Sequence, residues 1–132
     1  MSVILIPGSP GELIDKITIL EIKVAKILDE PKRMNVGREL KALYVSFEKN
    51  IIISTELTAL KLDLKTINEA LWDIEDDIRS CERKSDFGPV FVKLARSVYF
   101  ENDRRAALKK EINILLGSDI IEEKSYAKYQ CE

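Results

Sequence analysis

The chain has 132 residues, of which 45% are hydrophobic and 33% are charged, a composition typical of one soluble globular domain. Its 21 basic and 23 acidic residues are interspersed and give a net charge of −2, so the sequence offers no overall attraction to nucleic acid or to an anionic membrane. It contains no histidine, which excludes catalytic triads, general bases and metal sites that depend on an imidazole.

The apolar segments and the two cysteines of the sequence indicate where the protein is located. The sequence has no apolar run of the length that a membrane-spanning helix requires. The apolar run 3–6 is too short, and lacks the basic flank, to be a secretory signal. Cys81 and Cys131 have neither metal-ligand nor CxxC spacing, so free thiols are expected. We therefore predict a cytoplasmic protein that spans no membrane.

The first half of the chain predicts a short extended segment followed by two helices. Residues 3–6 can form a lone strand or an extended arm. Ser9 and Glu12 have the spacing of a capping box around Pro10, which predicts a helix that begins there and runs to about Asp29. A second helix is predicted from the proline at position 31 to about Phe47, and the β-branched run 51–53 leaves the next stretch ambiguous.

The second half predicts two long helices joined by a short break. Ser54 or Thr55 can begin a helix that reaches about Arg83, and a further helix follows the break at 85–89 and stops at Gly117. Each would be about 40 Å long. The sequence thus predicts one all-α domain over residues 1–132, an antiparallel helical bundle built on a long helix hairpin. Residues 119–132 form a polar tail that can dock through four apolar or aromatic residues, Ile120, Ile121, Tyr126 and Tyr129.

Several charged residues fall on the apolar sides of the predicted helices. Glu101 and Arg105 are four residues apart in the middle of the last apolar stripe, so we expect them to pair with each other or with groups on the third helix. Together with neighbours they define a candidate interior polar layer: Glu21, Glu75, Arg79, Glu101, Asn102 and Arg105. This layer is either a closed ion-pair network that fixes the register of the helices or a pocket for a small molecule or metal.

A second group of polar residues lies on the outer side of the third helix. Glu69, Asp73 and Asp76 share one side because they are spaced by four and three, and Trp72 lies beside them. A tryptophan bordered by acids is unusual for a solvated face. We interpret this outer face as packing against the tail or a second subunit, with contact to a ligand as the alternative.

Three long motifs give the chain a resemblance to a known family. They are GELIDKITILEIK at 11–23, NEALWDIEDDIR at 68–79 and NDRRAALKKEIN at 102–113. With the shorter segments 86–89 and 117–126, they resemble a family of small bacterial all-helical proteins of unknown function. The resemblance implies a bacterial cytoplasmic helical protein. It carries no known activity, so it assigns no catalytic residue.

The leading functional hypothesis is a non-catalytic binding or interaction module that forms a homodimer or binds a protein partner, without nucleic acid or membrane. It follows from the tryptophan beside an acidic face and from the lack of a nucleophile paired with a base. The basic residues Arg104, Arg105, Lys109 and Lys110 are spread around their helix, which disfavours a nucleic-acid site.

Two enzyme hypotheses remain open beside it, and no cofactor is predicted outside the first of them. A Mg²⁺-dependent all-α enzyme acting on a phosphorylated or nucleotide substrate would use Glu69, Asp73 and Asp76 as metal ligands. A chorismate-mutase-like helical enzyme would grip a dicarboxylate with four residues of the right types, Lys16, Glu21, Arg79 and Arg105.

Overall fold

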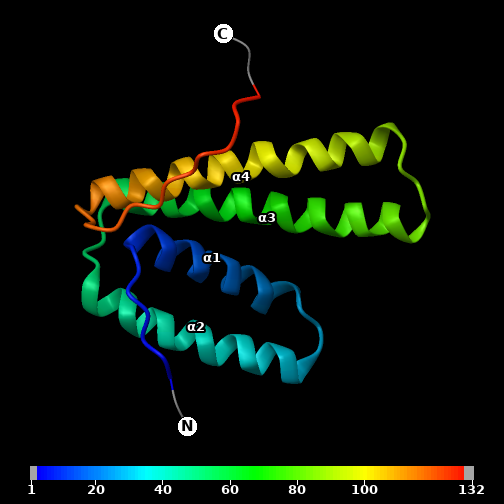
Figure 1. Cartoon of the computed structure of the whole chain (residues 1–132). Helices are drawn as coiled ribbons and strands as arrows, with labels where there is room; N and C mark the ends of the chain where they lie inside the picture. The colour runs from blue at the N-terminus through cyan, green and yellow to red at the C-terminus, as the bar shows by residue number, and fades with distance from the viewer. Residues whose placement is uncertain (1–2, 130–132) are drawn as a thin grey trace.

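The computed structural model describes residues 3–129, which form four α-helices and no strand. They are α1 (Pro10–Lys26), α2 (Glu30–Asn50), α3 (Thr55–Arg83) and α4 (Pro89–Leu115). The helices α3 and α4 lie side by side, α1 packs against both of them, and α2 lies outside α1 (Figure 1). The predicted all-α bundle is therefore confirmed. None of these helices is long and apolar enough to cross a membrane.

The helix ends follow the local signals of the sequence. The Ser9 hydroxyl accepts a hydrogen bond from the backbone N–H of Glu12 at 3.1 Å, and the Ser54 hydroxyl caps α3 in the same way. Gly117, with φ +66°, follows the end of α4 as predicted. Two boundaries were predicted imprecisely: α1 ends at Lys26, and α2 continues to Asn50. The ambiguous run 51–53 belongs to the link between α2 and α3.

The segments outside the helices lie on the surface. Residues 3–8 are extended and exposed and form an arm rather than a strand. Residues 118–129 run along α4 without regular structure (Figure 1). Of the four residues predicted to dock this tail, the Tyr129 ring contacts Tyr99 and Phe100. All four, Ile120, Ile121, Tyr126 and Tyr129, are exposed.

The hydrophobic core lies where α1 crosses the α3–α4 pair. Ile14 of α1, Leu57 and Leu64 of α3, and Ile112 of α4 are 0–2% exposed and form one cluster. Burying such side chains stabilises the fold by roughly 1.5–3 kcal/mol each. The core therefore unites the first half of α3 with the last turns of α4.

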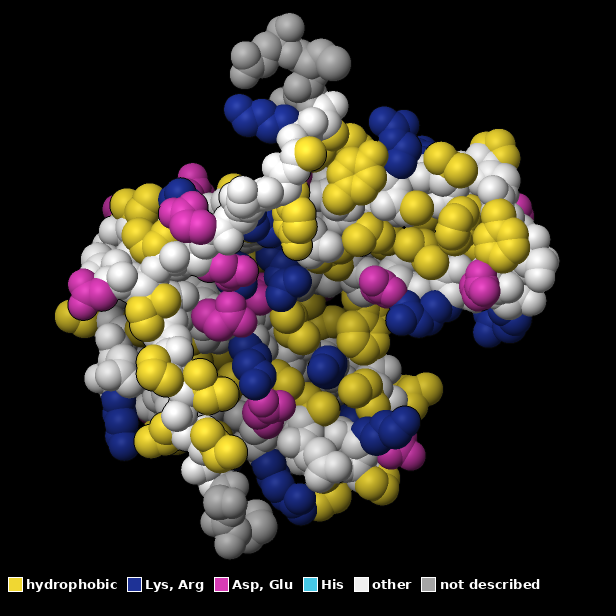
Figure 2. Space-filling view, viewed as in Figure 1, with side chains coloured by type: hydrophobic (Ala, Val, Ile, Leu, Met, Phe, Trp, Pro, Cys, Tyr) yellow, Lys and Arg dark blue, Asp and Glu magenta, His cyan; other side chains and the backbone are white. Residues whose placement is uncertain are grey.

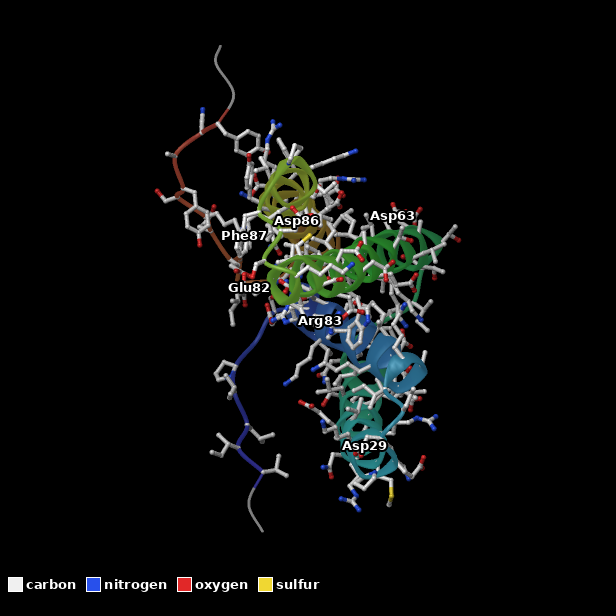
Figure 3. All side chains as sticks on the ribbon, turned by 90° about the vertical axis from the view of Figure 1, so that its right-hand side faces the viewer. Asp29, Asp63, Glu82, Arg83, Asp86 and Phe87 are labelled. Carbon is white, nitrogen blue, oxygen red and sulfur yellow. The ribbon has the colours of Figure 1, made fainter. Side chains whose placement is uncertain are left out.

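Burial along the α3–α4 pair is strongly uneven. The buried residues of α3 are Leu57, Leu64, Ile67, Asn68 and Cys81, and those of α4 are Ile112 and Asn113. Beyond Asn68 only Cys81 is buried, so residues 69–107 of the pair have almost no interior of their own. We call residues 69–107 the distal half. It extends past the end of the α1–α2 pair (Figure 1) and ends at the turn bearing Glu82, Arg83, Asp86 and Phe87 (Figure 3).

Candidate functional site

A fully buried carboxylate lies at the centre of the interior polar groups. The side chain of Asp15, on α1, is 1% exposed. Its two oxygens accept hydrogen bonds from the Arg105 guanidinium on α4, at 2.9 Å from Nε and 2.5 Å from Nη2. This two-point geometry is the strongest form of arginine–carboxylate pairing, and the bond to Asp15 raises the pKa of Arg105 although burial opposes it.

The third helix completes this network through an amide. Asn68 of α3 donates from Nδ2 to Asp15 Oδ1 and to Thr18 Oγ1, both at 2.9 Å. The Thr18 hydroxyl in turn donates to the backbone carbonyl of Asp15 at 2.8 Å. Among the described residues no buried side-chain nitrogen or oxygen lacks a partner. The network is therefore closed on itself, which fits a role in fixing three helices in register.

Lys109 extends the network to the surface and to the tail. Its ammonium lies 2.6 Å from Glu12 Oε2, 3.0 Å from Glu122 Oε2 and 3.9 Å from Asp15 Oδ2. Burial alone would lower the pKa of Lys109, but its hydrogen bonds to Glu12 and Glu122 raise that pKa above its ordinary value. The ammonium of Lys109, on α4, thus connects the start of α1, through Glu12, with the tail, through Glu122.

A pocket of about 520 Å³ lies between this network and the tail. Its wall on α4 includes Tyr99, Asn102, Arg105 and Lys109, and Glu12 and the tail residues close the other sides. The charged groups in the wall are held in ion pairs, Arg105 with Asp15 behind the wall and Lys109 with Glu12 and Glu122. The described lining holds two tyrosines, Tyr99 and Tyr126, and no serine, threonine or cysteine.

Glu21 belongs to a different cluster on the other side of α1. It accepts a short hydrogen bond from the Tyr44 hydroxyl of α2 and lies 3.7 Å from Lys61 Nζ and 3.4 Å from Lys65 Nζ of α3. This cluster ties α2 to the rest of the bundle.

Tyr44 makes this cluster sensitive to alkaline pH. Burial, and then the hydrogen bond to Glu21, raise the pKa of Tyr44 from 10.0 to about 12. Because the folded-state pKa is the higher one, the stabilisation is complete below pH 10 and is lost as pH rises toward 12. We expect the stability advantage of the wild type over Tyr44→Phe to shrink across this interval in urea titrations. Parallel pH curves for the two proteins would contradict this.

Two expected pairings in the interior layer are wrong. Glu101 pairs with Arg104 at 3.1 Å, not with Arg105, because a partner three residues away is as reachable as one four away. Glu75 does not turn inward to meet Glu101 and Arg105: its side chain is 51% exposed and pairs with Arg79 on the surface. Of the six predicted residues, Asn102 and Arg105 touch each other, at 3.5 Å, and Glu21 lies elsewhere.

The outer-face residues lie on the surface of α3. Glu69, Asp73 and Asp76 are exposed and Trp72 is half-buried, with Asp73 3.7 Å from Lys26. Within residues 3–129 no three acidic or cysteine side chains are grouped so that they could hold a metal ion. The residues of the chorismate-mutase-like hypothesis form separate ion pairs: Lys16 with Glu39, Arg79 with Glu75, Arg105 with Asp15, and Glu21 with Lys61 and Lys65.

Most of the interior network was not predicted from the sequence. The residues that were not predicted are Asp15, Thr18, Asn68 and Lys109, and Asn113 is a further buried polar residue outside the network. A signal was present, because Thr18 follows Ile14 by four residues and Asn68 follows Leu64 by four, which places both on apolar stripes. Thr18 and Asn68 were not selected because both are neutral and the candidate layer was built around charged side chains.

Comparison of the sequence with known proteins identifies one family. Searches of curated proteins and of solved structures gave no match. The model of a family of unknown function (DUF6165) matches residues 4–130, nearly the whole chain. That match agrees with the resemblance carried by the three long motifs. The four-helix chain with its closed Asp15–Arg105 network therefore belongs to the family of unknown function DUF6165.

Proposed function

We propose that this protein is a non-catalytic interaction module that assembles with a second copy of itself through the distal half of the α3–α4 pair. The observation that carries the proposal is the uneven burial of this pair. A two-helix layer with one buried side chain beyond Asn68 has an apolar side that a third or fourth helix normally covers. A second distal half would supply two such helices.

The apolar residues of this region support a contact surface. Phe87, Val90 and Val92 are 53%, 62% and 51% exposed, and the Phe87 ring packs edge-on against Phe91. Figure 2 shows hydrophobic side chains gathered over the free end of the α3–α4 pair. Contiguous exposed apolar residues of this kind mark interaction sites more often than chance exposure does.

The charges of the distal half are self-complementary, which favours a second copy over another partner. Residues 69–83 of α3 hold six acidic and two basic residues, whereas residues 89–100 of α4 hold two basic residues, Lys93 and Arg96, and no acidic one. Within the described chain Lys93 and Arg96 form no ion pair, and neither do Asp76 and Asp77. In a two-fold dimer each α3 can face the partner's α4, so that both contacts join opposite charges.

The closed interior network supports the non-catalytic part of the proposal. Its groups satisfy one another, and reactive groups at catalytic sites are instead left available to a substrate. The Asp15–Arg105 network is then structural, and the outer face with Trp72 belongs to the distal half that we propose for association.

Charge reversal tests the proposed dimer. Lys93→Glu with Arg96→Glu makes α4 acidic, and Asp76→Lys with Asp77→Lys makes α3 basic. Each double variant alone should lose at least tenfold in dimer affinity by sedimentation equilibrium, because like charges then meet at both contacts. An equimolar mixture should recover the dimer, since each new charge meets its opposite.

The mixture distinguishes specific pairing from general charge effects. Lys49→Glu on the exposed end of α2 is the matched control and should leave the dimer affinity within about twofold. A wild type that stays monomeric up to millimolar concentration, or a mixture no tighter than the two variants alone, would rule out this mode of assembly.

A further inference from the structure

The C-terminal segment 118–129 lies along α4 as an extended strap held by side chains rather than by backbone pairing (Figure 1). Besides the exposed pair of Glu123 with Lys110 at 3.5 Å, its described contacts with α4 include three positions, one for a carboxylate, one for an ammonium and one for an aromatic ring. Because α4 forms each position, it contacts the strap in the way that a peptide-binding surface contacts an extended peptide.

The carboxylate position is formed by Lys109. The Glu122 carboxylate lies 3.0 Å from its ammonium, which is only 11% exposed and already holds Glu12 at 2.6 Å. A nearly buried ammonium cannot turn freely toward water, so it presents a fixed donor to an acidic side chain.

The ammonium position is formed two residues further along the strap. Lys124 Nζ lies 3.5 Å from Asp103 Oδ1 and 3.5 Å from the carbonyl oxygen of Asn102. It also lies 5.5 Å from the centre of the Tyr126 ring, a distance typical of a cation–π contact. A carboxylate, a carbonyl and a ring together favour a cation at this position.

The aromatic position is formed near the middle of α4. The Tyr129 ring lies 5.0 Å from the Phe100 ring, edge-on, and 5.4 Å from the Tyr99 ring. Partial burial, and then the neighbouring Asp103 carboxylate, raise the pKa of Tyr129. Aromatic rings at such spacings attract each other in the edge-on arrangement, which orients the tyrosine ring.

These three positions define a register. Lys109, Asp103 and Tyr99 succeed one another along α4 at intervals of six and four residues, while Glu122, Lys124 and Tyr129 succeed one another in the opposite direction. The strap lies over the pocket of about 520 Å³ without filling it, and Tyr126 is 81% exposed. The strap's own side chains stay largely in contact with water, Glu122 being 57% and Tyr129 49% exposed, so the seating is reversible.

We propose that this face of α4 is a peptide-binding site for an extended segment that carries an acid, a lysine two residues later and a tyrosine five residues after that. The site takes this segment from a second copy of the chain when the strap of its own chain is unseated. In the single chain the strap occupies the site at a local concentration of about millimolar. A strap from another copy must compete with the chain's own strap at that local concentration. The site thus offers a second kind of link between copies, formed at positions 99–109 of α4, where it overlaps the inner end of the distal half.

Binding of a labelled peptide tests this site directly. The probe is a fluorescent peptide with the sequence of residues 118–129, and the receiver is the full chain carrying Glu122→Lys with Lys124→Glu. This exchange keeps the composition of the chain but places each charge of the strap against a like charge on α4. Fluorescence anisotropy should show the receiver binding the probe at least tenfold tighter than the wild type does, because its own strap no longer competes.

Three controls decide the interpretation. Adding Asp103→Lys to the receiver should abolish tight binding of the probe, whereas adding Lys49→Glu on α2 should not change it. A probe that carries the same exchange of Glu122 and Lys124 should not bind. Failure of the receiver to bind the native probe, equal binding by receiver and wild type, or equal binding of native and exchanged probes would each overturn the proposal.

Discussion

Replacing Arg105 with methionine is expected to lower the free energy of unfolding by about 3–5 kcal/mol, because Asp15 would keep its charge in the interior without a guanidinium to balance it. The Asp15 side chain is 1% exposed and both of its oxygens are bonded to Arg105. The amide of Asn68 and the Lys109 ammonium, 3.9 Å from Asp15 Oδ2, would remain. A neutral amide does not compensate a buried charge, and Lys109 lies closer to Glu12 and Glu122, at 2.6 and 3.0 Å. Urea denaturation followed by far-ultraviolet circular dichroism measures the loss.

The neighbouring arginine is the matched control. Arg104 pairs with Glu101 at 3.1 Å, and its side chain is 67% exposed. Exposed pairs contribute between nothing and about 1 kcal/mol, so Arg104→Met should cost less than that. If the two substitutions cost the same, the Asp15–Arg105 pair does not fix the bundle, and the closed network loses its structural role.

Gly11→Ala is expected to cost about 3 kcal/mol, because α1 and α4 meet without room for a methyl group at this position. An added Cβ would lie 2.5 Å from the backbone oxygen of Lys109 and 2.8 Å from Asn113 Oδ1. The Gly11 N–H also donates to that Asn113 oxygen at 2.7 Å. Since the nearest atom belongs to the backbone of α4, the helices must separate, and overpacking of this kind costs about 1–3 kcal/mol or more.

Gly37 gives the opposite expectation with the same substitution. It lies inside α2, and a Cβ at this position would meet nothing within 4 Å. Gly37→Ala should therefore stabilise the protein by about 0.5–1 kcal/mol through helix propensity. Thermal unfolding of the two variants should shift the midpoint in opposite directions. A Gly11→Ala variant as stable as the wild type would show that the close approach of α1 and α4 is not required.

The helix ends were predictable because their signals are local. Ser9 with Glu12, and Ser54 with Leu57, lie within four residues of each other, so the capping contact can be read directly from the chain. The stop at Gly117 was predictable for the same reason. The end of α1 was less so, since no glycine or proline marks Lys26 and the apolar pattern continues past it.

The interior partners could not be predicted in the same way. Arg105 was correctly placed on the inner side of its helix, but its partner Asp15 lies 90 positions away in the sequence. Residues three and four apart on one helix are always within reach, which made Glu101 the obvious but wrong partner. Pairing between residues far apart in the sequence depends on how α1 crosses α4. The periodicity of either helix alone does not determine that crossing.

The charged layer expected between the helices is not formed. A closed network around Asp15 takes its place, and of the six expected residues only Arg105 and Asn102 contribute to it. The two surfaces that we propose for association are the distal half of the α3–α4 pair and the face of α4 beneath the tail.

Amide hydrogen exchange across a dilution series tests the central claim most directly. If the distal half pairs with a second copy, the amides of residues 69–107 should become more protected as the protein concentration rises, while those around Ile14, Leu64 and Ile112 should not change. Exchange in residues 69–107 that is fast and independent of concentration from micromolar to millimolar would contradict assembly through the distal half.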